Sequence, residues 1–153
     1  MIIYRLAVAS FKSDLSGAGS KLFGGRWNIP GIAALYTAEN ISLSVLEILV
    51  AADKNTIPPE YYLMKLQVPD NLAVKKISAS KLKENWYADP GYTQFIGSNF
   101  LRSGEEAILK VPSVIVNEEH NYLLNPIHPD FKKVKLIDSI PFNFDVRLFK
   151  PNE

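Results

Sequence analysis

The order of apolar and polar residues along the chain predicts more strands than helices. Residues 2–8 mix β-branched and aromatic side chains, as strands do, and residues 61–68 partly alternate between apolar and polar. Pro112 interrupts an apolar stretch and marks a strand start, a bulge or an edge. Residues 121–125 are expected to form a short turn or helix. The other expected strands are residues 33–37, 72–77, 107–111, 113–116, 134–139 and 145–149.

Two segments predict helices. Residues 40–53 are nearly apolar all round from Leu43 onward, with Asn40 or Ser42 as the cap, so this helix should be largely buried. Residues 91–103 predict a second helix that Gly104 closes. Strands with two or three flanking helices place the chain in the α+β class.

Residues 10–30 form a polar, glycine-rich segment that is expected to be a long loop. Loops longer than about 12–15 residues inside a compact domain are usually functional or disordered. This one carries Phe23, Arg26 and Trp27, which favours a functional role.

Composition excludes several classes of protein. The chain has 153 residues, which predicts one domain over 1–153. Its net charge of +1 provides no general attraction to nucleic acid. The absence of cysteine and the presence of two histidines exclude disulfides, cysteine nucleophiles and His-rich or Cys-based metal sites, so no metal is expected. No apolar run reaches the roughly 20 residues of a membrane span, and no secretory signal is visible, so a cytoplasmic protein is expected.

Familiar nucleotide and hydrolase motifs are incomplete in this chain. The run from Gly17 resembles a dinucleotide fingerprint, but Leu22 stands where the third glycine belongs. The run from Gly19 resembles a P-loop, but Gly25 replaces the lysine. There is no Gly-x-Ser-x-Gly elbow.

Glu47 is the most informative residue, because it is the only charge between Asn40 and Asp53. At helical spacing its neighbours are mostly aliphatic, so its carboxylate loses solvation unless a partner meets it. It could form a structural ion pair or lie exposed at a helix end. It could equally line a cleft as a functional carboxylate.

Three further residues could serve a ligand or simply the fold. Arg26 follows two glycines, so its guanidinium and the nearby backbone N–H groups would suit a pyrophosphate, or the side chain could stack on Trp27. Tyr36 could pack in the core or stack on an aromatic ligand. Ser113 could fill space in a strand or bind a ligand.

The ordered set of these motifs resembles the RES-domain toxins of bacterial toxin–antitoxin pairs, a family named for an Arg, a Glu and a Ser. The resemblance spans nearly the whole chain. It rests on Tyr4-Arg-Leu, Leu22-Phe-Gly-Gly-Arg-Trp-Asn28, Leu35-Tyr-Thr-Ala-Glu39, the helix around Glu47, Ile96-Gly, Leu101-Arg-Ser-Gly104, Val111-Pro-Ser113 and Asn121-Tyr-Leu-Leu-Asn-Pro-Ile-His-Pro-Asp-Phe131.

The resemblance implies an ADP-ribosyltransferase-like fold, with a mixed β core and a few helices, that binds NAD and cleaves its nicotinamide–ribose bond. It implies that Glu47 stabilises the ribose cation, that Arg26 holds the pyrophosphate and that Tyr36 orients the nicotinamide. Further NAD contacts would come from Gly25, Asn28 and Ser113. The expected partner is an Xre-type antitoxin that blocks the active site, with no direct contact between this chain and nucleic acid.

Three alternatives remain open at this point. The chain could deplete free NAD by hydrolysis or phosphorolysis, or it could transfer ADP-ribose to a specific protein. It could also be a non-catalytic binding module of the same fold. Exposed strand edges in a chain of this size would allow a homodimer.

Overall fold

In the computed structural model, which describes residues 1–53, 55–56 and 58–149, a single twisted sheet runs through the molecule. The order of its seven strands is β4-β5-β6-β2-β1-β3-β7. Neighbouring strands are antiparallel except β4 and β5, which are parallel. The strands are β1 (Ile2–Val8), β2 (Leu35–Ala38), β3 (Tyr61–Gln67), β4 (Val74–Lys76), β5 (Ile108–Pro112), β6 (His120–Leu124) and β7 (Lys135–Phe142).

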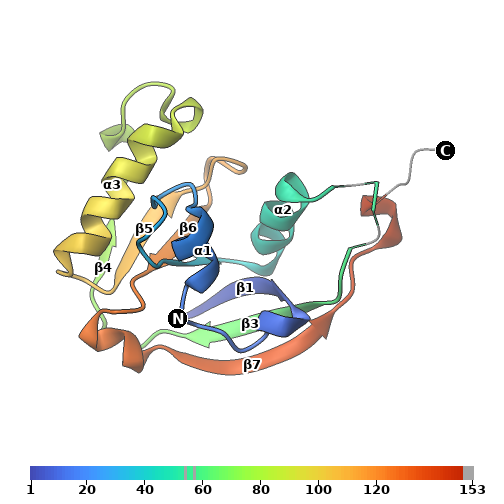
Figure 1. Cartoon of the computed structure of the whole chain (residues 1–153). Helices are drawn as coiled ribbons and strands as arrows, with labels where there is room; N and C mark the ends of the chain where they lie inside the picture. Colours follow the sequence, from blue (N-terminus) through green and yellow to red (C-terminus); the bar gives the residue numbers. More distant parts are fainter. Residues whose placement is uncertain (54, 57, 150–153) are drawn as a thin grey trace.

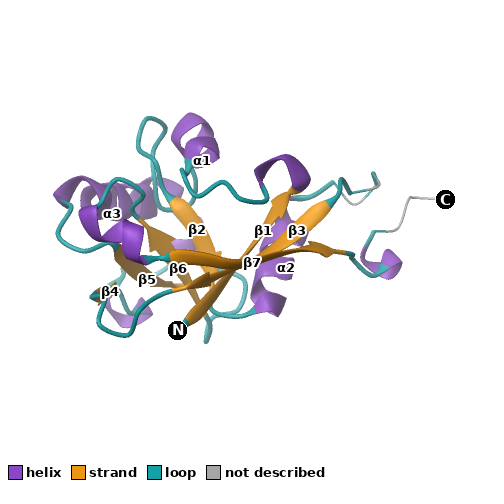
Figure 2. Ribbon diagram, turned by 90° about the horizontal axis from the view of Figure 1, so that it is seen from below, coloured by secondary structure: helices purple, strands orange, loops and turns teal. Residues whose placement is uncertain are grey.

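Three α-helices accompany the sheet in the described residues: α1 (Ala18–Phe23), α2 (Ile41–Ala51) and α3 (Pro90–Ser103). α3 packs over the half of the sheet that holds β4, β5 and β6, whereas α2 lies beside β1 and β2 (Figure 1). In the view from below, α3 lies at the left and α2 lies to its right, beside the central strands (Figure 2).

The core has two parts. One centres on buried residues of the β1–β3 half, such as Ile3, Met64 and Leu66. The other lies under α3, where Trp27 and Trp86 pack with ring centroids 5.9 Å apart. The predicted α+β class is therefore confirmed, because helices pack on a mostly antiparallel sheet.

Local signals define both long helices as expected. The Asn40 side chain accepts a hydrogen bond from the N–H of Leu43 at 2.7 Å, which caps the start of α2. Gly104 ends α3 in the left-handed conformation at φ +62°. The prediction that the first of these helices is largely buried is wrong, since only Leu43 and Ser44 are buried and Val50 is 70% exposed. One side of α2 packs on the sheet and the other faces solvent.

Four other segments differ from the prediction. The expected loop at 10–30 contains α1, whose Ser20 hydroxyl bonds to the Ala34 carbonyl and so depends on a distant partner. Residues 113–116 form a turn rather than a strand, because the Ser113 hydroxyl accepts the N–H groups of Ile115 and Val116. Residues 121–125, expected as a turn or helix, belong mostly to β6 between β5 and β2. Residues 146–148 form a 3-10 turn instead of a strand, with the Asp145 carboxylate accepting from the Arg147 N–H.

Candidate active site

A cavity of about 520 Å³ opens between α1, α2 and the β1–β2–β6 face of the sheet. Its volume lies in the range of small-molecule sites. Four of the predicted residues line it, namely Gly25, Arg26, Tyr36 and Glu47. Asn28 and Ser113 do not belong to its lining.

Glu47 reaches the cavity from the second half of α2. Its side chain is half-buried, and its Oε1 accepts a hydrogen bond from Nδ2 of Asn121 at 2.7 Å. Among the described residues, no lysine, arginine or histidine forms an ion pair with it. The geometry therefore favours the cleft carboxylate over the structural ion pair.

Arg26 lies at the opposite wall, in the turn that follows α1. Its Nη1 donates to the backbone carbonyl of Tyr87 at 2.9 Å, which uses one of the five guanidinium N–H donors. Trp27 does not act as a stacking partner at the surface, because it is buried against Trp86. Most of the hydrogen-bonding capacity of Arg26 is therefore available to a ligand.

α3 holds the backbone of the Arg26 turn with a row of side chains. Thr93 donates its hydroxyl to the Arg26 carbonyl at 2.6 Å, and Gln94 donates its Nε2 to the Gly25 carbonyl at 2.9 Å. One turn later, the Ser98 hydroxyl accepts the N–H of Ile29 at 3.1 Å. Because these contacts fix the backbone at three points, the direction in which Arg26 leaves it is well defined.

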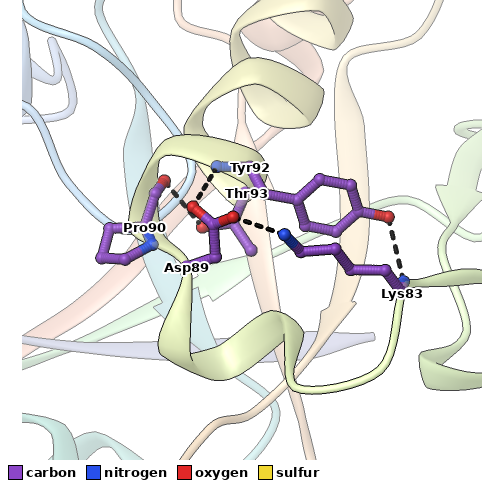
Figure 3. A network of polar contacts seen from close by, with 5 residues as sticks. All are labelled: Lys83, Asp89, Pro90, Tyr92 and Thr93. Atoms are coloured by element: carbon purple, nitrogen blue, oxygen red, sulfur yellow. Dashed lines mark hydrogen bonds and ion pairs between the residues drawn. The ribbon is translucent and has the colours of Figure 1, made fainter.

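The start of α3 is itself anchored by a polar network (Figure 3). The Asp89 carboxylate accepts the N–H of Tyr92 at 3.1 Å as the helix cap and forms an ion pair with Lys83. The Lys83 N–H donates to the Tyr92 hydroxyl at 3.1 Å. Lys83 and the hydrogen-bonded Tyr92 backbone hold the pKa of Asp89 below its usual value, so the cap stays ionised near neutral pH.

Tyr36 joins the cavity to the Arg26 turn. Its hydroxyl donates to Oδ1 of Asn28 at 2.6 Å and accepts the N–H of Trp27 at 2.9 Å. Burial raises the pKa of the Tyr36 hydroxyl, so this group stays protonated at neutral pH. It can therefore donate one hydrogen bond and accept another at the same time. A Cβ on Gly25 would lie 2.6 Å from that hydroxyl oxygen, which explains why glycine stands at this position.

Asn28 and Ser113 shape the cavity from behind its wall. The Asn28 carboxamide is fully buried and donates to the carbonyls of Ser20 at 2.9 Å and Ile32 at 2.8 Å. The buried Ser113 hydroxyl holds the turn that brings Val114 and Ile115 into the lining. The geometry gives these two side chains contacts with protein backbone, and their contact with NAD stays a prediction.

Among the lining residues that were not proposed for the site from the sequence, Arg5 and Asn121 have the side chains best suited to bind or orient a charged group. Arg5 is the only charged residue of β1, and this isolation among apolar residues is a signal that the sequence offered. Its Nη1 donates to the Tyr36 carbonyl at 3.1 Å, while its buried Nε has no partner in the described part of the chain. Burial lowers the pKa of Arg5 from a very high value, so desolvation strengthens its attraction for an anion.

Other kinds of site find little support in the described residues. No group of three His, Cys, Asp or Glu side chains there could hold a metal ion. Within the same residues, no helix combines the length and apolar character that a bilayer crossing requires.

Known proteins that are similar to this chain are named as toxins, and the family model that matches it is that of the RES domain. A family model described as RES domain matches residues 2–145. A protein of Sphingobium sp. named Prs ADP-ribosylating toxin is 39% identical over 90% of this chain and 88% of its own length. A protein named Toxin Res from Photorhabdus laumondii is 36% identical, and another Toxin Res from Yersinia enterocolitica is 34% identical. The Photorhabdus match covers 98% of both chains, and the Yersinia match covers 97% of this chain and 99% of the relative.

A solved structure resembles the chain in fold. A chain of the M. tuberculosis MbcT–MbcA toxin–antitoxin complex superposes with a TM-score of 0.76 at 22% identity, over 92% of this chain and 83% of the other. A likeness at this identity concerns the fold. It agrees with the mixed sheet and three helices described above and confirms the expected ADP-ribosyltransferase-like fold.

Proposed function

The chain belongs to the RES domain family, and from this premise we propose that it is the toxin of a toxin–antitoxin pair. We further propose that it binds NAD in the described cavity and breaks the bond between nicotinamide and ribose. One observation supports this most directly: the cavity combines two arginines, Arg5 and Arg26, with a carboxylate, Glu47, that forms no ion pair with any described residue.

The charges of the cavity complement those of NAD. The pyrophosphate carries two negative charges, and a guanidinium presents a planar fork that matches phosphate oxygens. Arg26 would hold the pyrophosphate, with Arg5 as a second cation and the Gly25 backbone close to the ligand. The nicotinamide ring of NAD is cationic, so the uncompensated Glu47 carboxylate would attract that end of the molecule.

The chemistry requires little beyond this arrangement. As the C1′–N bond breaks, its electron pair moves to the pyridinium nitrogen, so nicotinamide leaves as a neutral molecule without a general acid. Positive charge develops on the ribose, as in glycosyl transfers with oxocarbenium-like transition states. The Glu47 carboxylate would stabilise that charge in a partly desolvated site. A water oxygen then bonds to C1′ and passes one proton to the solvent, or a phosphate oxygen bonds to C1′ instead. No metal takes part in these steps.

A second candidate reaction is transfer of ADP-ribose to a specific protein. It is favoured by the name of the Sphingobium relative, an ADP-ribosylating toxin that is 39% identical to this chain. The bond cleavage would be the same, and only the nucleophile would differ. A non-catalytic binding module is the alternative of another class.

One incubation separates these readings. The purified chain is mixed with NAD in phosphate or phosphate-free buffer, with and without a bacterial extract, and nicotinamide is quantified by chromatography. Mass spectrometry then identifies ADP-ribose, its phosphate ester or an ADP-ribosylated protein. Release of nicotinamide supports the proposal, whereas NAD binding without any release would establish the binding module.

The partner in this proposal is an antitoxin of the Xre type. It is supported by the solved structure of similar fold, which is part of the M. tuberculosis MbcT–MbcA toxin–antitoxin complex. We include three further points in this proposal. The chain forms a single domain over 1–153, and it acts in the cytoplasm, where free NAD is present. It assembles into a homodimer. The proposal expects a small helix-turn-helix protein to be encoded beside this chain, and co-expression of the two should abolish growth inhibition. Size-exclusion chromatography reports the oligomeric state.

A further inference from the structure

We propose that Asn121 is the positioning residue for Glu47: its amide holds one carboxylate oxygen so that the other faces the substrate. This inference rests on the proposed role of Glu47 in cleaving NAD. The contact that carries it is the hydrogen bond from Nδ2 of Asn121 to Oε1 of Glu47 at 2.7 Å, made inside the cavity that both residues line.

Asn121 lies in an inner strand of the sheet, β6, which is hydrogen-bonded on both sides. In β6 it is paired with Ala38 of β2 on one side and with Val111 of β5 on the other. Its backbone is therefore fixed from both directions, and the pleat sets the face on which its side chain emerges. Glu47, in contrast, has a long side chain that loses several rotamers when it is held in one place. The Asn121 amide thus holds the Glu47 side chain in one conformation, which the glutamate would not keep by itself.

The chemical nature of the donor matters. An asparagine amide is neutral, so it orients the carboxylate without cancelling its charge, whereas a lysine or arginine at the same distance would pair with it. No described residue forms an ion pair with Glu47 or donates a hydrogen bond to its Oε2. A charge that is fixed and uncompensated is what stabilises a developing cation most effectively.

Neighbouring acids show a different pattern. The Glu39 carboxylate accepts the N–H of His120 at 2.9 Å and lies 3.6 Å from the His120 ring nitrogen. Glu119 accepts the side-chain amide of Asn40 at 3.0 Å. Neither acid lines the cavity. Of these three carboxylates, only that of Glu47 combines a single neutral donor with a place in the cavity.

The contact is not needed to attach α2 to the sheet. Leu43 is fully buried, and the Ser44 hydroxyl donates to the Tyr4 carbonyl of β1 at 3.3 Å. The Asn40 cap, which also bonds Glu119, fixes the helix start. With these contacts in place, loss of the Asn121 amide should leave α2 where it is and release only the Glu47 side chain.

The test measures kcat and KM for nicotinamide release by the full chain. Asn121→Ala should lower kcat about 10-fold or more while KM for NAD changes less than about 3-fold, because the lost interaction orients a group that acts in the transition state. His120→Gln is the matched control on the adjacent residue, whose side chain leaves the opposite face of β6. It should retain the kcat of the parent. Circular dichroism and thermal unfolding show whether each variant is folded.

Two further variants distinguish positioning from a structural role. Asn121→Asp keeps the volume of the side chain but supplies a donor only while a proton is shared between the two carboxyls. Its kcat relative to the parent should therefore fall as pH rises. In the Glu47→Gln background, Asn121→Ala should change the residual rate less than about 2-fold, because the group that Asn121 orients has lost its charge.

The outcomes separate this inference from the function on which it rests. If the parent releases nicotinamide and Asn121→Ala is as fast, or if the Asn121→Asp profile runs parallel to that of the parent, the positioning role is overturned and the function stands. If Asn121→Ala slows the Glu47→Gln variant as much as it slows the parent, Asn121 acts independently of Glu47. If the parent releases no nicotinamide, the proposed function fails and the role of Asn121 falls with it.

Discussion

Gly97 of α3 lies against the backbone of Trp27 so closely that a Cβ on Gly97 would be 1.9 Å from the Trp27 carbonyl oxygen. This contact lets the helix approach the turn that carries Arg26, with Thr93 and Ser98 hydrogen-bonded on either side. The distance between α3 and the turn that carries Arg26 is therefore as short as it is because Gly97 has no side chain.

Gly97→Ala should destabilise the fold, because the new methyl group overlaps backbone that three neighbouring hydrogen bonds hold in place. Overpacking of this kind costs about 1–3 kcal/mol. Urea unfolding followed by circular dichroism measures the loss. Gly91→Ala, in the first turn of the same helix, is the matched control, since its Cβ would have only one ordinary contact at 3.6 Å. Equal stability of the two variants would contradict the close approach.

Tyr36→Phe should weaken the fold at neutral pH and change its response to alkali. Removal of the hydroxyl leaves the side-chain Oδ1 of Asn28 and the backbone N–H of Trp27 without their partner, which costs about 1–3 kcal/mol.

The alkaline effect follows from the raised pKa of Tyr36. Above pH 10 the unfolded chain loses this proton while the folded chain keeps it, so the parent loses about 1 kcal/mol of stability per pH unit from this group. The free-energy difference between parent and Tyr36→Phe should therefore shrink between pH 10 and 11. Tyr87→Phe, which removes an exposed hydroxyl, should follow the parent, and a pH-independent difference for Tyr36→Phe would refute the explanation.

Glu47→Gln should abolish most turnover while the fold is retained. The amide has nearly the shape of the carboxylate but cannot stabilise a cation by its charge, and loss of one such group costs about 100-fold or more in kcat. Nicotinamide release measures the rate, and calorimetry measures NAD binding. A variant that consumes NAD like the parent would remove Glu47 from the mechanism.

Arg26→Ala should weaken NAD binding more than it changes the fold. A hydrogen bond to a charged group contributes about 1.5–3 kcal/mol, so the dissociation constant should rise about 10-fold or more. Calorimetry in the Glu47→Gln background avoids consumption of the ligand. Arg26→Lys keeps the charge but loses the planar fork, and it should give an intermediate affinity. An unchanged dissociation constant in Arg26→Ala would reject the role of this residue in binding phosphate.

Several features of this protein could be predicted from residues that are close together in sequence. The cap at Asn40, the left-handed Gly104 and the apolar runs of β1 and β3 are local signals, and they predict elements near their observed positions. The unusual carboxylate at position 47 could be recognised in the same way, because it is isolated among aliphatic neighbours.

Other features depended on partners far away along the chain. Residues 120–124 form a strand because their backbone is paired with β2 on one side and with β5 on the other. The sequence of the segment alone does not predict this pairing. Ser113 begins a turn where a strand was predicted from its apolar neighbours. The buried Asn28 side chain bonds to backbone carbonyls of residues 20 and 32, and its contact with NAD, which the family resemblance implies, stays a prediction. Asn121 is recognised as a lining residue only from the fold, whereas the isolated charge of Arg5 in β1 was already a signal in the sequence.

The sequence by itself therefore determined the class of the fold, the ends of its long helices and the residue types at the centre of the site. The tertiary structure decided which side chains face the cavity and which support it from behind. The physical reason is that caps and turns are stabilised by atoms a few residues away. Strand pairing and many side-chain hydrogen bonds instead join groups that are not neighbours in the sequence. Asn121 and Glu47 are 74 residues apart, and their contact exists only once the sheet has formed.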